Sequence, residues 1–356
     1  SSFIAMGDPV DREALKRAAT LYLPTGAFYM LPERLGCEVG SLSVGEARPA
    51  MRTSVWLDDQ GRVTGYEHRR VTIRVGERLN YEQADQLLAQ GEGATAQALR
   101  LLDEVARARA EVRRSRGALF ISRREWKLQV RDQGESIQAI PLDPNSPSRA
   151  LVAEMMILTG SLAARDASER GVPIIYRTQP PPTDPLPEVA PGHPAAFALL
   201  RRHLHPASLS LSPDQHWGLG LEAYTQVTSP LRRYADLVAQ RQLGAVIAGE
   251  PPPYNAQELL RVLAAAEATE KEAKRMEAAV KERWGLEYVR RLDQKEALAA
   301  MVLGEHPAGG YQAQLQCCGA VGILQDDRRH EPGMELEVDI KTVRPDKGTL
   351  RLLPSA

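Results

Sequence analysis

Apolar residues recur at helical spacing in four segments of the chain. Residues 11–21 form a short repeat of this kind. Residues 82–113 carry a longer one, which a Gly-Glu-Gly sequence interrupts, so this segment predicts a helical pair or one long helix. Residues 150–170 are apolar enough to predict a buried helix. Residues 256–293 are rich in Ala, Glu, Lys and Arg and predict one long helix.

Alternating apolar and polar positions mark the strands. Residues 50–80 predict two strands joined by a turn at Asp58-Asp59-Gln60-Gly61. Strand-like segments follow around residues 117–141. From about residue 294 the chain consists of short alternating strands separated by Gly and Pro-Asp turns. This last pattern predicts a small five-stranded barrel of the oligonucleotide-binding type.

The length and these patterns together predict two domains. A chain of 356 residues is too long for one ordinary hydrophobic core. Residues 1–293 are expected to form an α+β domain in which helices surround a mixed sheet. Residues 294–356 are expected to form the all-β barrel.

The composition narrows the setting in which the protein works. Hydrophobic residues make up 43% of the chain and charged residues 26%, as is usual for a soluble globular protein. No apolar run approaches the length of about 20 residues that spans a membrane, and no secretion signal opens the sequence. Three cysteines do not make a disulfide framework, so a cytoplasmic protein is expected. The net charge of −1 does not indicate a polyanionic partner, although a local basic groove is compatible with it.

The sequence Ser-Pro-Leu-Arg-Arg places two cations where a helix is predicted to begin. Ser229 is a good N-cap and Pro230 a good first helical residue. Arg232 and Arg233 then fall in the first turn, where a cation opposes the helix dipole at a cost of about 0.3–1 kcal/mol. In one interpretation Arg232 pairs with Asp236 one turn later. In the other, an arginine and free backbone N–H groups converge on one anion, such as a phosphate.

The two arginines lie within a longer segment whose sequence is distinctive. The sequence HWGLGLEAYTQVTSPLRRYADLVAQR at 216–241 closely resembles the signature of the ribonuclease II / ribonuclease R family of exoribonucleases. Residues 11–36 resemble the Leu-Pro-rich segment of that family, and residues 152–164 with 172–177 resemble another segment. The predicted terminal barrel resembles the S1 RNA-binding domain that ends these enzymes. The resemblance covers nearly the whole chain.

The resemblance implies a processive hydrolase. Members of the family degrade single-stranded RNA from its 3′ end and release nucleoside 5′-monophosphates at a magnesium site inside a threading channel. The implied cofactor is therefore Mg²⁺, with Mn²⁺ as a substitute, and the implied partner is the 3′ end of a single-stranded RNA. A monomer is expected. The alternative is a catalytically inactive RNA-binding homologue that captures RNA 3′ ends.

The resemblance also implies which residues act at the reaction centre. Arg232 matches the family arginine that contacts the scissile phosphate, where negative charge builds up in the transition state. Glu277 is the candidate for a glutamate that assists near the reaction centre, and Glu272 and Glu282 are its rivals. Asp236 is interpreted as an orienting partner of the arginines.

Seven further residues are matched to RNA contacts by the resemblance: Tyr22, Tyr81, Phe120, Glu154, Arg233, Tyr234 and His216. Tyr22 and Phe120 match the aromatic pair that stacks on bases, where each stack contributes about 1–3 kcal/mol. Tyr81 and Glu154 match residues that contact the final nucleotides and help to select RNA over DNA. Glu154 also lies on an apolar helix, where a buried carboxylate needs a partner. His216 is assigned a structural or RNA-contact role.

The metal ligands of the family have no counterpart in the sequence. The family holds its metal with a cluster of aspartates, and no sequence of the DxDD kind occurs here. The closely spaced aspartates are interpreted instead as helix caps, a hairpin turn and a barrel loop: Asp8 with Asp11, Asp58 with Asp59, and Asp326 with Asp327. The metal-binding aspartates are therefore expected upstream of Ser1, and the metal ligands are unknown.

Overall fold

The computed structural model describes residues 3–190, 192–292 and 296–355. Its α-helices are α1 (Pro9–Arg17), α2 (Tyr81–Gln90), α3 (Ala94–Arg114), α4 (Pro147–Glu169), α5 (Ala196–Leu200), α6 (Tyr234–Ile247) and α7 (Ala256–Arg291). Its strands are β1 (Leu21–Leu23), β2 (Gly26–Phe28), β3 (Ala47–Leu57), β4 (Val63–Arg74), β5 (Glu125–Arg131), β6 (Ser136–Leu142), β7 (Tyr176–Thr178), β8 (Ser208–Ser210), β9 (Leu298–Glu305), β10 (Tyr311–Leu315), β11 (Val321–Leu324), β12 (Glu335–Arg344) and β13 (Thr349–Pro354). The expected domain boundary at 293/294 lies outside the described residues.

The helices predicted from periodicity are present, and side-chain caps precede α1, α2, α4 and α7. The segment predicted as a helical pair or one helix is a pair, α2 and α3. The Asn80 side chain accepts a hydrogen bond from the Gln83 amide, and the Gln83 side chain accepts one from the Asn80 amide. Asn255 and Glu258 form the same capping box at the start of α7. The α+β class of the first part of the chain is confirmed.

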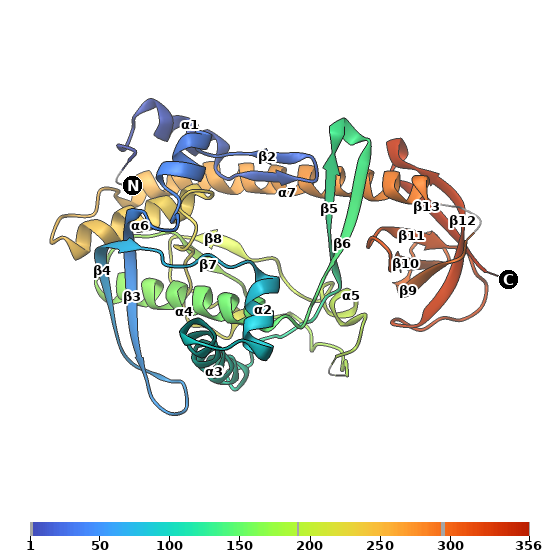
Figure 1. The fold of residues 1–356 in the computed structure, drawn as a ribbon, viewed down its shortest axis with the longest axis horizontal. Coiled ribbons are helices and arrows are strands. Elements are labelled where there is room, and N and C mark those ends of the chain that lie inside the picture. Colours follow the sequence, from blue (N-terminus) through green and yellow to red (C-terminus); the bar gives the residue numbers. More distant parts are fainter. Residues whose placement is uncertain (1–2, 191, 293–295, 356) are drawn as a thin grey trace.

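The strands before the barrel differ from the expected mixed sheet. In the described ranges they form four antiparallel pairs, β1–β2, β3–β4, β5–β6 and β7–β8, each of two strands. The longest pair is the predicted hairpin of β3 and β4, in which Thr53 lies opposite His68. The Asp58 carboxylate closes its turn by accepting hydrogen bonds from the amides of Gln60 and Arg62. Helices or long connections separate the pairs along the chain, so each pair packs on helices rather than on the next pair (Figure 1).

The last five strands form the closed barrel predicted from the sequence. The strand order around it is β10-β11-β13-β12-β9, with β11 and β13 parallel and the other neighbours antiparallel. Its interior is filled by alternating apolar residues, including Val302, Leu315 and Leu352. This closed barrel is consistent with an oligonucleotide-binding fold.

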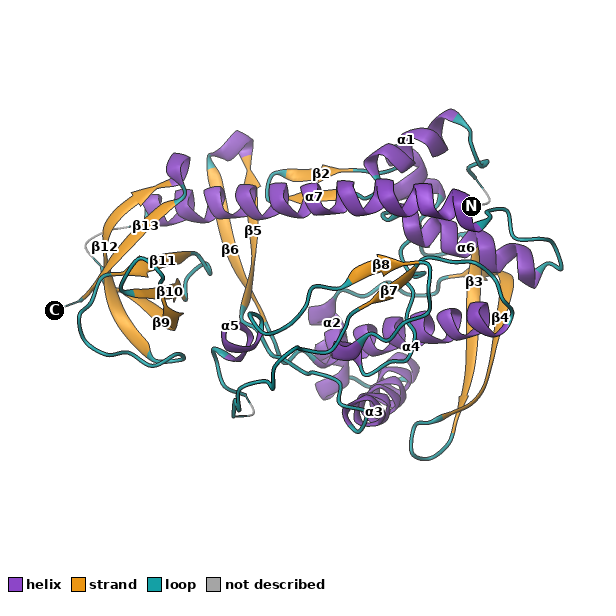
Figure 2. Ribbon diagram, turned by 180° about the vertical axis from the view of Figure 1, so that it is seen from behind, coloured by secondary structure: helices purple, strands orange, loops and turns teal. Residues whose placement is uncertain are grey.

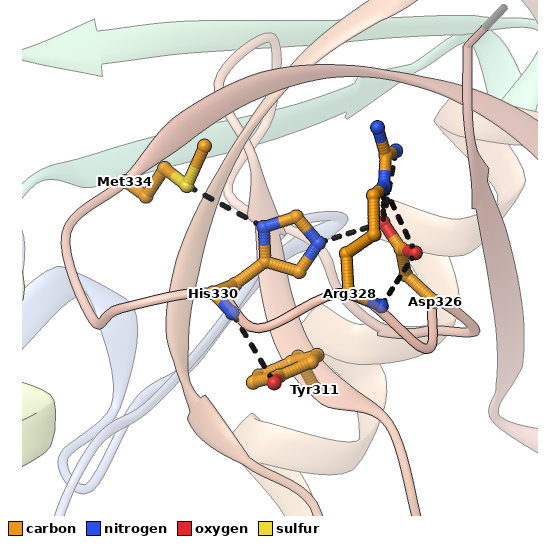
Figure 3. Close-up of polar contacts among 5 residues, drawn as sticks. All are labelled: Tyr311, Asp326, Arg328, His330 and Met334. Carbon is orange, nitrogen blue, oxygen red and sulfur yellow. Dashed lines mark hydrogen bonds and ion pairs between the residues drawn. The ribbon is translucent and has the colours of Figure 1, made fainter.

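A polar cluster holds the loop between β11 and β12 against the barrel (Figure 3). The ring of His330 is buried, and its Nε2 lies 2.6 Å from the Asp326 carboxylate. The His330 amide donates a hydrogen bond to the Tyr311 hydroxyl, 3.2 Å away. Arg328 donates to the same carboxylate and holds the pKa of Asp326 well below its usual range. Asp326 thus has the loop role that the sequence predicted for it.

Helix α7 extends from the core around α1 and α6 to the barrel (Figure 1, Figure 2). Near its start, Leu259 and Val262 pack in a core formed with α1 and α6. Near its end, Leu286 and Val289 pack in the core of the barrel. The strand pair β5–β6 crosses α7 between these two ends (Figure 1). No helix in the described part of the chain is long and apolar enough to span a membrane.

Candidate nucleic-acid site

The helix predicted to begin after Ser229 begins four residues later. Helix α6 starts at Tyr234, and Arg233 occupies the N-cap position with extended backbone. Residues 229–233 form a turn, because the amides of Arg232 and Arg233 both donate to the Ser229 carbonyl at 3.1 and 3.0 Å. The Ser229 amide donates to the carboxylate of Asp236 at 2.8 Å. The backbone of Arg233 is extended and pairs with Ala19, so the helix does not continue from Ser229 and the N-cap prediction is wrong.

Asp236 orients the turn through its buried carboxylate. Besides the Ser229 amide, its Oδ2 accepts a hydrogen bond from Nη2 of Arg233 at 2.7 Å. Burial raises the pKa of Asp236, against the effect of Arg233. The pairing proposed between Arg232 and Asp236 is therefore made by Arg233 instead. Arg233, which was expected to contact RNA, is mostly occupied with this structural ion pair.

Arg232 is left with an exposed side chain on a fixed backbone. Its carbonyl accepts a hydrogen bond from the Thr20 amide at 3.0 Å, and the Tyr234 amide donates to the Ala18 carbonyl at 2.8 Å. These bonds join the turn to the segment that leads into β1. Arg232 and Tyr22 consequently line the same cavity, which has a volume of about 610 Å³. The predicted phosphate and base contacts are thus brought together.

Tyr22 is half exposed and is anchored to α7. Its side chain is 51% exposed, so a ring face is available to a ligand. Its amide donates a hydrogen bond to the Glu277 carboxylate at 2.8 Å. The rival residues Glu272 and Glu282 are exposed, and Glu282 lies beside Gly348 of the barrel. Of the three glutamates, the geometry favours Glu277 as the one near the site.

Phe120 lies against arginine side chains at the end of α3. Its ring is 43% exposed, and the guanidinium carbons of Arg113 and Arg114 lie 4.8 and 4.5 Å from its centroid. Such contacts hold an aromatic ring in place while leaving part of its surface open. The exposure of Phe120 is compatible with the predicted stacking role.

Glu154 has a protein partner that occupies both of its oxygens. Nε of Arg113 donates to Oε2 of Glu154 at 3.0 Å, and Nη2 of Arg113 donates to Oε1. The two side chains are 5% and 7% exposed. Nη1 of Arg113 also donates to the Leu219 carbonyl at 3.0 Å. The prediction that a buried carboxylate here has a partner is confirmed, whereas the expected RNA contact of Glu154 is corrected to a buried ion pair.

Tyr81 lies in a different cavity from Arg232. It is the first residue of α2, and the guanidinium carbon of Arg149 lies 4.3 Å from the centroid of its ring. The cavity that it lines has a volume of about 970 Å³. The exposed ring of Tyr81 is compatible with a contact to RNA. The structure does not place this ring against Glu154, the residue with which it was expected to select RNA over DNA.

His216 and Tyr234 have structural surroundings. The His216 amide donates to the Leu221 carbonyl at 2.8 Å, and its ring meets Tyr224 edge to face at 5.8 Å. Burial, with help from the positive charge of Arg177, lowers the pKa of His216 to about 4, so the ring is neutral at pH 7. A structural role fits His216 better than an RNA contact.

Tyr234 is 2% exposed, which corrects the expectation that it contacts RNA. Its hydroxyl donates to Asp11 at 3.0 Å, and the same Asp11 oxygen accepts from Arg241 at 2.8 Å. Burial raises the pKa of Tyr234. Asp8 is the N-cap of α1, as predicted, and Asp11 accepts from the Gly7 amide before that cap with one oxygen while its other oxygen belongs to the buried network.

Sequence reasoning missed Arg113 and Arg177. Arg113 is the partner of Glu154, and Arg177 on β7 lies 3.9 Å from Glu270 and beside His216. Arg113 lies in no motif that distinguishes it from an ordinary surface arginine, and Arg177 ends the segment 172–177 that resembles the family but was not singled out there. The available signal for Arg113 was Glu154 itself, because a carboxylate on an apolar helix requires a cation somewhere in the chain.

The described residues do not by themselves fit a metal site. Within 3–190, 192–292 and 296–355, no group of three or more His, Cys, Asp or Glu side chains could hold a metal ion. Two-metal phosphodiester chemistry needs several convergent carboxylates. The paired aspartates of the chain serve as a cap, a buried ion-pair partner and loop anchors instead.

Comparison with known proteins identifies the family. The RNB domain profile matches residues 1–188 and 192–249. The chain belongs to the RNB-domain family. Its similarity to an uncharacterised ribonuclease of Synechocystis is 37% identity over 295 residues, which is 81% of this chain and 43% of that protein. Its similarity to exoribonuclease 2 of Klebsiella pneumoniae is 29% identity over 70% of this chain and 45% of that enzyme. This RNB-domain chain therefore spans less than half the length of these two relatives.

Solved structures show the same fold. The RNase R of Mycoplasma genitalium superposes with a TM-score of 0.85 at 18% identity, over 99% of this chain and 65% of that one. That protein has also been solved in complex with ribose-methylated single-stranded RNA. Yeast Ssd1, described as a pseudonuclease, superposes with a TM-score of 0.66 at 20% identity, over 88% of this chain and 43% of that one. The fold thus occurs in a protein named RNase R and in a protein described as a pseudonuclease.

Proposed function

We propose that this chain is part of a hydrolytic exoribonuclease that degrades single-stranded RNA processively from the 3′ end and releases nucleoside 5′-monophosphates. The observation that supports this most directly is the joint lining of one cavity by Arg232 and Tyr22. A fixed cation beside an open aromatic ring suits a phosphate and its adjacent base. The relatives named as ribonucleases support the same assignment.

In this proposal Arg232 binds the scissile phosphodiester. Negative charge grows on the phosphate oxygens in the transition state, and a guanidinium held on a hydrogen-bonded turn stabilises that charge without reorganising. Asp236 is a positioning residue, because it holds the Ser229 amide and the Arg233 side chain that shape the turn. Glu277 is a second positioning residue, because it holds the backbone of Tyr22.

Tyr22 and Phe120 supply sequence-independent stacking. Every base presents a π face, so an exposed aromatic ring binds any nucleotide at the end of the strand. The arginines behind Phe120 hold its ring at a defined angle. Such contacts suit an enzyme that advances along RNA of any sequence. The terminal barrel is proposed to capture the strand farther from its 3′ end, with residues 294–356 as the corresponding domain.

The metal of the proposed reaction is Mg²⁺, with Mn²⁺ as a substitute, and its aspartate ligands are proposed to lie upstream of Ser1. When bound, such a metal activates water and neutralises charge on the phosphate. The chain described here contributes the phosphate-binding arginine and the stacking rings. The protein is further proposed to act as a monomer in the cytoplasm.

The test is a degradation assay on the protein with its upstream segment. A 5′-labelled poly(A) should be shortened to small products only when Mg²⁺ or Mn²⁺ is present, with nucleoside 5′-monophosphates released. Chelation should stop the shortening while RNA remains bound. Release of internal fragments, or of 3′-monophosphates, would contradict the proposal.

A second candidate is an RNA-binding homologue without activity. The fold that the chain shares with Ssd1, described as a pseudonuclease, is compatible with it. In the same assay this homologue would bind poly(A) with or without metal and leave its length unchanged.

A further inference from the structure

Two adjacent cysteines lie in the turn of the barrel that joins β10 to β11. Cys318 is 2% exposed and belongs to the hydrophobic core of the barrel, whereas Cys317 is half-buried and packs against that core. The third cysteine, Cys37, is exposed and lines the cavity of Arg232, in another part of the chain. The proposed function uses neither thiol of the adjacent pair.

The two adjacent thiols interact with each other. The Cys318 thiol donates a hydrogen bond to the sulfur of Cys317. This bond lowers the pKa of Cys317 and raises the pKa of Cys318, and burial raises the pKa of Cys318 further. Because the thiolate is the reactive form of cysteine, Cys317 is the nucleophile of the pair, and Cys318 is held beside it.

The turn that carries the pair is packed against β5 and α7. Gly319 has a φ of +75°, and a Cβ added to it would collide with the ring of Trp126 on β5. Ala320 faces Gly285 of α7, where an added Cβ would lie 3.8 Å from that of Ala320. Burial raises the pKa of Tyr288, also on α7, and the two neighbouring sulfurs raise it further. A change in the conformation of this turn must therefore move Trp126 or α7.

A disulfide between the two cysteines would distort this turn. Neighbouring Cα atoms are about 3.8 Å apart, whereas the Cα atoms of an ordinary disulfide are about 4.4–6.8 Å apart. The reduced turn is held by backbone hydrogen bonds from Leu315 to the Ala320 carbonyl at 2.8 Å and from Gly319 to the Leu315 carbonyl at 2.9 Å. A ring closed between adjacent residues strains such a turn, and a strained disulfide is easily reduced again.

We propose that Cys317 and Cys318 form a reversible oxidation site, whose oxidant is a peroxide and whose product is a disulfide between the two adjacent residues. The Cys317 thiolate attacks one oxygen of hydrogen peroxide, and the O–O bond breaks to leave a sulfenic acid on Cys317 and a hydroxide ion. The Cys318 sulfur then attacks the Cys317 sulfur. The S–O bond breaks, and the leaving oxygen takes the Cys318 proton and departs as water.

This reaction moves two electrons from the two sulfurs to the peroxide. A small dithiol reverses it by thiol–disulfide exchange and is itself oxidised to a disulfide. Oxidation loosens the packing of the turn on β5 and α7, because the turn that fits Trp126 and Gly285 is the reduced one. The inference does not depend on RNA being the ligand of the protein.

The first test follows the thiols in the Cys37→Ser chain, where Cys317 and Cys318 are the remaining cysteines. After brief treatment with hydrogen peroxide, Ellman's reagent should detect neither thiol in the denatured chain, and the intact mass should fall by two hydrogen atoms. Dithiothreitol should restore both thiols. Retention of both thiols, a gain of oxygen on them, or a disulfide-linked dimer in place of the internal bond would overturn the proposal.

Single substitutions in the Cys37→Ser chain separate the two roles. Dimedone, which traps sulfenic acids, should label Cys317 after peroxide treatment of Cys318→Ala, because no second thiol resolves the intermediate there. It should leave Cys318 unlabelled in Cys317→Ala, because that thiol is buried. Labelling of Cys318 rather than Cys317 would contradict the assigned order of attack.

The second test measures the consequence for stability. The peroxide-treated Cys37→Ser chain should unfold at a lower urea concentration than the reduced chain, since a ring of two residues gains little from loop closure to offset its strain. Peroxide-treated Cys317→Ala in the same background is the control for methionine oxidation, and its midpoint should not move. Equal midpoints for the oxidised and reduced chains would overturn the inference that the bond distorts this turn. Both tests are made without RNA, so their failure would leave the proposed function untouched.

Discussion

The guanidinium of Arg113 is enclosed with the carboxylate of Glu154, whereas the side chain of Arg232 is exposed and lines a cavity. Both arginines lie beside an aromatic ring matched to base stacking. Arg113 has a carboxylate and a carbonyl as permanent partners. Arg232 is fixed only through its backbone. A held backbone with an exposed side chain is what we expect of a ligand-binding cation, whereas the side chain of a structural cation has its partners within the protein.

Arg113→Ala should have the largest effect on stability. It leaves the Glu154 carboxylate buried without its partner, which typically costs about 3–5 kcal/mol of unfolding free energy. Urea unfolding followed by circular dichroism measures the loss. Arg114→Ala is the matched control, because Arg114 contacts the same Phe120 ring but pairs at the surface with Glu111. The control should lose at most about 1 kcal/mol. Equal losses of unfolding free energy in Arg113→Ala and Arg114→Ala would show that the buried ion pair is no more important than the surface pair.

Arg232→Ala should have the largest effect on catalysis. Loss of a fixed transition-state contact typically lowers kcat by about 10²–10³-fold, whereas ground-state binding of RNA should fall far less. Single-turnover degradation and filter binding of the same RNA, on the protein with its upstream segment, give the two quantities. The midpoint of urea unfolding should stay unchanged, because the Arg232 side chain is exposed. Equal losses of rate and affinity would contradict the assigned role.

His216 should produce a smaller effect that depends on pH. Its pKa of about 4 in the folded chain is below the ordinary value of about 6.5. The unfolded chain therefore binds a proton in this range that the folded chain does not. The unfolding free energy should fall as the pH is lowered from about 6.5 towards 4, by at most about 1.4 kcal/mol per pH unit. His216→Gln should flatten this slope, and the exposed His205→Gln should not. An unchanged slope in His216→Gln would show that the ring titrates normally.

Local sequence patterns predicted the helices, turns and strands better than the long-range contacts that these elements make. The capping residues Asn80 and Asn255, the Asp58 turn and the barrel alternation act over a few residues, so the sequence contains the whole signal. The start of α6 was missed because Arg233 is extended and pairs with Ala19, and this long-range pairing has no local pattern. A Ser-Pro pair predicts an N-cap only when the residues after it keep helical backbone.

The site residues also differed in how well the sequence predicted their surroundings. Resemblance to the family pointed to Arg232, Tyr22 and Glu277, which the fold brings to one region. It also pointed to Glu154 and Tyr234, whose environments depend on residues far along the chain. Arg113 lies 41 positions before Glu154, and no periodicity relates the two. Only the folded structure shows which polar side chains, such as Glu154 and Tyr234, form buried hydrogen bonds within the protein.

Helix α7 gives the molecule a mechanical link. Its 36 residues extend for about 54 Å at the helical rise of 1.5 Å per residue. One end is embedded among α1 and α6, and the other is embedded in the barrel. Glu277 lies between these anchors and holds the backbone of Tyr22. Under the proposed function, a pull by RNA on the barrel would therefore be transmitted along this stiff helix to the backbone of Tyr22.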